Sequence, residues 1–416
     1  MSDMYSSSTS FEYLNDEENN SNGSNGQVNS SIINQYERPG DSNEDGNIDI
    51  QSLSNSVTSE NDLWTFYEKD ANRDSEEPNV TKSDRILRCL LKSDMRGLRK
   101  LGREKNGFIS DSLRRLVWPR LAKAEIVESV PKPSREQLEN LETYNVICKD
   151  VIRTCFYQEV DEITRESWQD QLRRLVARLM VKNPDFHYFQ GYHEICLIFL
   201  MVLGEEMAFH TMNSVSRTHL RKFLTGRDER LFKEEAERQF DLIYLIIGEE
   251  EPKLREFLEA AEFYPSYLIA WILTWFAHNV KGYKNIVRLL DLFLVSDPLM
   301  PLYLSAAILL HKKDDILTLE CSFEEVYYFI NKIWEREEEI SLEDLICNAR
   351  SLMSKYSPEK LTELHASRVK QLSQRKQRSA LSNILHLVRQ SSSLRMLSIP
   401  MAVMIVAYIY QNYLTN

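Results

Sequence analysis

Hydrophobic residues recur at helical spacing from residue 81 onward. At the start of this region, Thr81 and Asp84 form the pattern of a helix-capping box. The apolar face that follows consists of Ile86, Leu87, Leu90 and Leu91. Residues three and four apart lie on one side of a helix, so this spacing predicts an amphipathic helix that begins at Thr81.

Two further helix starts follow. Ser110 or Asp111 is placed to cap a helix with apolar residues at 113, 116 and 117, and Ser134 precedes a long amphipathic stretch through Tyr157. Alternating strand patterns are weak beyond residue 80. The pattern predicts an all-α body.

The first 80 residues lack this periodicity. They are rich in Ser and Asn and contain 17 acidic but only three basic residues, which accounts for the net charge of −12 of the whole chain. Such a segment cannot bury enough apolar surface to offset the entropy lost on folding, so residues 1–80 are predicted to be a disordered acidic tail. Its aromatic cluster, Leu63–Tyr67, is either a docking motif or a segment packed on the domain, and packing is favoured.

A second departure from amphipathic spacing is a set of long apolar runs. The run Phe263–Val280 contains Pro265, His278 and Asn279, so we expect a buried core helix there. Met396–Leu414 is different, because it has no charge and follows Arg389 and Arg395. Nineteen helical residues span roughly 28 Å, enough for a thin bilayer such as that of the endoplasmic reticulum.

We therefore expect residues 394–416 to be a C-terminal transmembrane anchor, with a final core helix as the alternative. Residues 361–393 are expected to form a basic linker with an amphipathic helix, because no acidic residue follows Glu363. The basic flank predicts that the domain stays cytosolic. The six cysteines form no CxxC pair and the N-terminus has no signal-peptide pattern, which also favours a cytosolic body with free thiols.

Motifs for small-molecule chemistry are missing. Gly97 and Gly102 have the spacing of a phosphate loop, but the Lys-Ser/Thr that should follow is absent and no strand precedes them. A zinc site would need His187, His193 and Cys196, but the zincin pattern fails because Leu197 stands where its second histidine belongs. No metal site and no cofactor of its own are expected.

Two segments carry the functional argument. In the first, Asp150 and Arg153 lie three residues apart on a predicted helix, where the carboxylate can brace the guanidinium group. The second runs from Tyr188 through Gln190 and Gly191 at a break after a proline, where glycine permits a tight turn and close approach of another backbone. Either segment alone is most simply read as a surface ion pair or an ordinary loop.

Together the two segments resemble the signature motifs of TBC-domain Rab GTPase-activating proteins, IxxDxxRT and YxQG. Thr154 completes the first motif. The resemblance extends over residues 84 to 355. It includes an opening helix with Arg114 and Trp118 and a third motif with Arg288 and Asp291, four residues expected to contact the partner or to support the fold.

The resemblance implies a two-lobed helical domain at residues 81–360 that acts on a Rab-family GTPase. It implies that Arg153 is an arginine finger and that Gln190 replaces the glutamine of the GTPase, with Asp150, Thr154, Tyr188 and Gly191 in support. The chain would then be an activator and not an enzyme, since Mg-GTP is bound by the partner. No nucleic-acid partner is expected.

The run Asp297–Tyr303 and the sequence Gln190–His193 resemble the endoplasmic-reticulum members that have a C-terminal membrane segment. This implies an early secretory Rab, a role in transport between endoplasmic reticulum and Golgi, and residence on one of those membranes. Two alternatives remain: a pseudo-GAP that binds Rab without activating it, and a soluble helical adaptor. The intact motif residues argue against the first, and membrane extraction would test the second.

Overall fold

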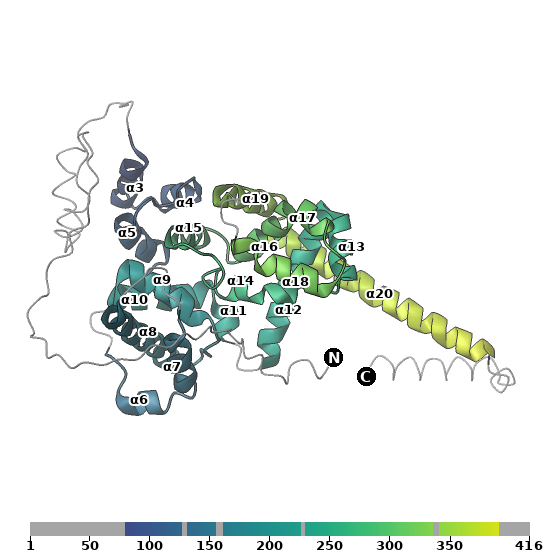
Figure 1. Cartoon of the computed structure of the whole chain (residues 1–416), viewed down its shortest axis with the longest axis horizontal. Coiled ribbons are helices and arrows are strands. Elements are labelled where there is room, and N and C mark those ends of the chain that lie inside the picture. The colour runs from purple at the N-terminus through teal and green to yellow at the C-terminus, as the bar shows by residue number, and fades with distance from the viewer. Residues whose placement is uncertain (1–79, 127–130, 155–160, 226–228, 336–340, 391–416) are drawn as a thin grey trace, which may run out of the picture. The chain divides into compact units, whose positions relative to one another are not determined.

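The computed structural model describes residues 80–126, 131–154, 161–225, 229–335 and 341–390. Every regular element in these ranges is a helix, and they contain no β-strand (Figure 1). The all-α prediction is confirmed. The acidic tail through residue 79, its aromatic cluster and the expected anchor at 394–416 lie outside the described residues.

A first group of helices packs together over the N-terminal half of the described chain. Helices α3, α4 and α5 contact one another, α5 packs on α9 and α10, and α7 and α8 pack on each other and on α9. The bounds are α3 Lys82–Leu91, α4 Met95–Arg103, α5 Asp111–Leu121, α6 Arg135–Glu139, α7 Tyr144–Ile152, α8 Glu162–Lys182, α9 Tyr192–Leu203, α10 Glu205–Thr218 and α11 Arg221–Leu224.

A second group surrounds α12 and α16, which pack on each other and carry α13, α14, α17, α19 and the start of α20. Helix α15 packs on α4 and α5 of the first group and on α16 of the second, and the hydrophobic core continues through both. The bounds are α12 Glu229–Glu250, α13 Pro252–Ala260, η1 Pro265–Leu268, α14 Ile269–Leu273, α15 Tyr283–Leu294, α16 Met300–His311, α17 Lys313–Leu317, α18 Phe323–Asn331, η2 Ile333–Glu335, α19 Leu342–Lys355 and α20 Pro358–Gln390.

The helix starts follow the local sequence. Thr81 accepts a hydrogen bond from the backbone N–H of Asp84 while the Asp84 carboxylate accepts from Thr81 N–H, so the predicted capping box is present. Ser110, and not Asp111, caps α5. These contacts satisfy N–H groups that a helix leaves without partners in its first turn.

Two predicted helices are broken. The stretch from Ser134 is not one helix: α6 ends at Glu139 and is followed by Asn140, and α7 begins after Thr143. Asn and Thr favour helix ends over helix interiors. The apolar run from Phe263 is buried as expected, but it forms η1, the short α14 and a turn in which Trp275 and Phe276 have positive φ. Trp275 and Phe276 of this turn both pack against Phe293 of α15, a tertiary contact that hydrophobic periodicity does not reveal.

Helix α20 crosses the expected boundary between residues 360 and 361. Its first turns pack on α12, with Leu361 fully buried, and the helix continues through the basic linker to Gln390. In the part of the chain that the structure describes, no helix combines the length and the apolar composition that crossing a membrane requires.

Candidate functional site

Asp150 lies on the face of α7 that packs into the protein. Ile147 and Val151 of the same helix are buried, and Asp150 itself is only 4% exposed. A carboxylate removed from water in this way needs hydrogen-bond donors around it. Because Asp150 is buried, its carboxylate must accept hydrogen bonds from neighbouring side chains.

Both carboxylate oxygens of Asp150 accept hydrogen bonds. Arg153 Nη2 donates to Oδ1 at 3.0 Å, and the Tyr188 hydroxyl donates to Oδ2 at 2.8 Å. The Thr154 hydroxyl donates to the backbone carbonyl of Asp150 at 3.1 Å. The predicted bracing of Arg153 by Asp150 is confirmed, and Asp150 also ties this helix end to the segment that carries Gln190.

Arg153 remains accessible although two of its guanidinium nitrogens make hydrogen bonds. It follows the last residue of α7, its Nε donates to the carbonyl of Lys149 at 3.4 Å, and its side chain is 61% exposed. Gln190 is also exposed and makes no side-chain hydrogen bond within the described ranges. Since Tyr188 is bonded to Asp150 and precedes Gln190 by two residues, the structure brings both predicted finger residues to one region of the surface.

Gly191 connects this segment to α9 with a φ of 99°, a conformation that side chains with a Cβ rarely adopt. A Cβ at this position would lie 2.6 Å from Cγ2 of Thr274. The close approach predicted from the sequence is therefore made by a side chain after α14 and not by another backbone. The Thr274 hydroxyl donates to the carbonyl of Ala270 at 2.6 Å, which fixes that methyl group in place.

The environments of Tyr188 and His193, which lie near Asp150, shift the pKa values of both side chains. Burial, reinforced by the Asp150 carboxylate, raises the pKa of Tyr188 far above its usual value, so its hydroxyl keeps its proton. Burial also lowers the pKa of His193, whose Nδ1 lies 2.9 Å from the Tyr188 hydroxyl. His278 is a contrast: its hydrogen bond to Glu194, 2.9 Å from Nδ1, raises its pKa.

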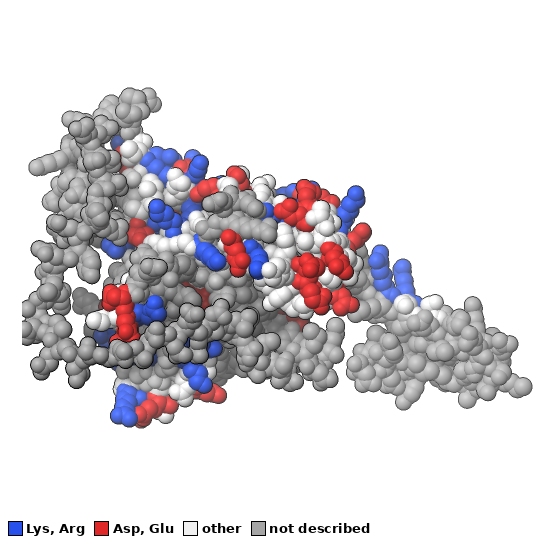
Figure 2. Space-filling view, in the orientation of Figure 1, with Lys and Arg blue, Asp and Glu red and all other residues white. Residues whose placement is uncertain are grey.

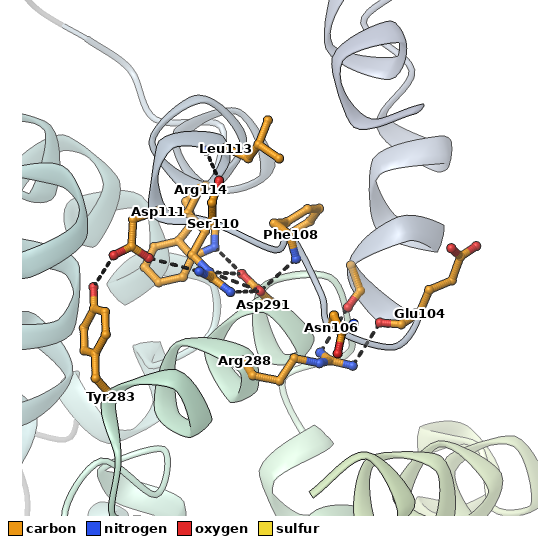
Figure 3. Close-up of polar contacts among 12 residues, drawn as sticks. Glu104, Asn106, Phe108, Ser110, Asp111, Leu113, Arg114, Tyr283, Arg288 and Asp291 are labelled. Atoms are coloured by element: carbon orange, nitrogen blue, oxygen red, sulfur yellow. Dashed lines mark hydrogen bonds and ion pairs between the residues drawn. The ribbon is translucent and has the colours of Figure 1, made fainter. Parts of the chain in front are cut away.

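The other four predicted residues lie in buried networks around α15 (Figure 3). Asp291 is fully buried and accepts hydrogen bonds from Arg114 Nη2 at 2.9 Å, from Trp118 Nε1 at 2.8 Å and from the backbone N–H of Phe108 at 2.9 Å. Arg114 Nη1 also donates to Asp111 at 3.0 Å. This network joins α5, the loop before it and α15.

Arg288 forms the second network. Its guanidinium group donates to both oxygens of Glu343, at 2.7 and 3.0 Å, and to the carbonyls of Gly102 and Glu104 at 3.2 and 3.1 Å. Figure 3 shows Arg288 reaching toward the chain around Glu104 and Asn106. With Arg114 and Arg288 each 5% exposed and both fully engaged inside the chain, their position suits support of the fold and not contact with a partner.

Comparison with known proteins identifies the fold. Residues 111–317 match the family described as the Rab-GTPase-TBC domain. TBC1 domain family member 20 of Bos taurus is 30% identical over 271 residues, which are 65% of this chain and 65% of that protein. These residues form a TBC domain.

Two further proteins show weaker similarity to this chain. The GTPase-activating protein gyp10 of Schizosaccharomyces pombe is 29% identical over 232 residues, 56% of this chain and 61% of that protein. The crystal structure of the Chlamydomonas flagellar RabGAP TBC domain is 17% identical, covers 72% of this chain and 93% of that one, and superimposes with a TM-score of 0.49.

Every site residue predicted from the sequence lies within the matched part of the TBC domain. Sequence reasoning missed three residues that complete the polar networks: His193 beside Tyr188, Glu343 beside Arg288, and Phe108, whose backbone N–H reaches Asp291. His193 carried a signal, because it belongs to the sequence Gln190–His193 on which the subgroup resemblance rests. Glu343 and Phe108 carried none, since their partners are far away in the sequence. In the described ranges, no three His, Cys, Asp or Glu side chains are grouped as metal ligands.

Proposed function

We propose that this chain stimulates GTP hydrolysis by a Rab-family GTPase, using Arg153 and Gln190 in trans. The observation that supports this best is the bridge made by Asp150, which holds an exposed arginine with one oxygen and the segment of an exposed glutamine with the other. A buried acid that holds one nitrogen of an arginine whose side chain stays 61% exposed orients that arginine for an external anion.

The chemistry of GTP hydrolysis matches this arrangement. Phosphoryl transfer spreads negative charge over the γ-phosphate oxygens, and a protein accelerates it by neutralising that charge and positioning the attacking water. Arginine is always charged and donates from a planar fork, and a glutamine amide both donates to and accepts from water. Apolar Ile152, 65% exposed beside Arg153, offers surface for a protein partner.

The first test uses Arg153→Ala and Arg153→Lys in the full-length protein, with a panel of purified GTP-loaded Rabs. Both variants should lose on the order of 10³-fold or more of the stimulated rate, since lysine lacks the fork. Arg135→Ala is the matched control, because Arg135 is 92% exposed and its ion pair among the described residues is with Glu139 on α6. Near-normal stimulation by Arg153→Ala would exclude the mechanism.

The glutamine has its own measurement. A Rab whose switch glutamine is changed to leucine should still respond to the wild-type protein, whereas Gln190→Ala should fail on wild-type Rab. Complete resistance of the substituted Rab would show that the GTPase supplies the glutamine itself. We propose an early secretory Rab as substrate, on the strength of the subgroup resemblance at Gln190–His193 and Asp297–Tyr303.

We further propose that residues 394–416 anchor the domain to the endoplasmic reticulum or early Golgi membrane. The support is the uncharged run Met396–Leu414 and the basic side chains of α20, part of which Figure 2 shows in blue. Deleting 394–416 should move the protein to the soluble fraction without loss of activity in solution. Val403→Arg should do the same, at a cost of roughly 2.5–3.5 kcal/mol at mid-bilayer, whereas Val403→Leu should not. Misfolding of the truncated protein would place the segment in the core.

A further inference from the structure

The Tyr188 hydroxyl lies between two groups and has one hydrogen to give. Its oxygen is 2.8 Å from Oδ2 of Asp150 and 2.9 Å from Nδ1 of His193. The carboxylate of Asp150 can only accept, and a charged acceptor binds a hydroxyl hydrogen more strongly than a neutral ring nitrogen does. The hydrogen of Tyr188 therefore points to Asp150, and the contact with His193 requires that Nδ1 be the donor.

This requirement selects one tautomer of His193. The ring is 4% exposed, and its burial favours the neutral form, which carries a single N–H. With the hydrogen on Nδ1, His193 donates to the Tyr188 hydroxyl and Tyr188 donates to Oδ2 of Asp150. Arg153 donates to the other oxygen of the same carboxylate, so every hydrogen bond in the network has one donor and one acceptor. With the hydrogen on Nε2, the lone pair of Nδ1 would compete with Asp150 for the hydroxyl hydrogen.

The charged groups around His193 come from three elements. Asp150 lies on α7 and Arg153 directly follows that helix, Glu194 follows His193 on α9, and His278 follows α14. The Glu194 Oε1 is occupied by His278 at 2.9 Å, so the nearest carboxylate on the same helix is held by another histidine. Among the described residues, His193 makes its side-chain hydrogen bond with Tyr188.

We propose that His193 is a positioning residue for Arg153. Its Nδ1–H holds the Tyr188 hydroxyl toward Asp150, which leaves the other oxygen of Asp150 to orient the guanidinium group. A hydroxyl that accepts a hydrogen bond becomes a stronger donor, so the chain is cooperative. This inference rests on the proposed activity of Arg153, and it adds a residue that touches neither the GTPase nor the nucleotide.

The test compares three variants of the full-length protein in single-turnover hydrolysis by the Rab that wild-type protein stimulates. His193→Leu removes the donor and should lower the maximal stimulated rate about fivefold, the equivalent of one net hydrogen bond, with the half-saturating concentration unchanged. His193→Asn places an amide N–H where Nδ1 stood and should recover most of the rate. His193→Gln, the matched control, carries its amide one carbon further out and should behave like His193→Leu.

A second comparison separates positioning from packing. Tyr188→Phe removes the hydroxyl through which His193 acts, so His193→Leu should lower the rate no further in that background. A general packing defect would instead reduce the rate again by a similar factor. The proposal is overturned if His193→Leu retains the wild-type rate, if Asn and Leu lose equally, or if the two single losses multiply.

The tautomer gives a readout that needs no GTPase. In full-length protein with ¹⁵N-labelled histidine, the His193 ring signals, assigned by their disappearance in His193→Asn, should report a neutral ring with the hydrogen on Nδ1. A hydrogen on Nε2 would overturn the proposal. If wild-type protein stimulates no Rab, the proposed function fails, and the ring signals still decide whether the hydrogen-bond chain exists.

Discussion

Replacing Asp291 with asparagine keeps the size of a fully buried side chain and removes its charge. Both carboxylate oxygens are in use: Oδ1 accepts from Arg114 Nε and Trp118 Nε1, and Oδ2 accepts from Arg114 Nη2 and the Phe108 N–H. Asparagine has one acceptor, and in either orientation its NH2 group must face donors. At least one of them loses its partner, and Arg114 loses its buried counter-charge.

The magnitude follows from burial. Breaking a buried ion pair costs about 3–5 kcal/mol, and a buried donor left without a partner costs about 1–3 kcal/mol. These costs overlap, because Arg114 Nη1 keeps its contact with Asp111 at 3.0 Å. We expect the free energy of unfolding to fall by at least about 3 kcal/mol, which lowers the melting temperature by roughly 6–12 °C in a domain of this size.

The assay is thermal and urea-induced unfolding of the full-length protein. Glu139→Gln is the matched control, because it makes the same chemical change in the Arg135–Glu139 pair, whose side chains are 92% and 63% exposed. An exposed pair of this kind contributes less than about 1 kcal/mol. If Asp291→Asn lowers the free energy of unfolding no more than Glu139→Gln does, water or a rearranged Arg114 satisfies the buried donors. Our account of how α5 is attached to α15 would then be wrong.

Two further predictions concern the proposed site. Gly191→Ala should reduce stability and stimulated hydrolysis together, because a Cβ would lie 2.6 Å from Thr274 and displace the segment of Gln190. Gly204→Ala is the control, since Gly204 also has a positive φ, 76°, but nothing lies within 4 Å of its Cβ; equal loss of activity in both variants would exclude the steric explanation. His193, whose pKa is lowered by burial, binds fewer protons when folded, so unfolding free energy should fall as pH drops below about 6.5. Measured by urea unfolding from pH 7 to 5, that slope should be smaller in His193→Asn, and an unchanged slope would contradict the shift.

The sequence by itself determined the all-helical class and the starts of helices such as α3 and α5. The capping box at Thr81 and the Asp150–Arg153 pair are predictable because they join residues three positions apart, and helix geometry fixes such distances. It also indicated the two motifs of the site. The breaks after Asn140 and within Phe263–Val280 were missed, since each depends on what the neighbouring helices leave room for.

Only the tertiary structure decided which distant residues meet. Asp150 and Tyr188 are 38 positions apart, Trp118 and Asp291 are 173 apart, and no local pattern fixes either contact. The proposed direction of the hydrogen bond from His193 also depends on such a contact, because the Tyr188 hydroxyl donates its hydrogen to Asp150. Local spacing determines which face of a helix a side chain occupies, whereas the packing of helices determines which residues that side chain contacts.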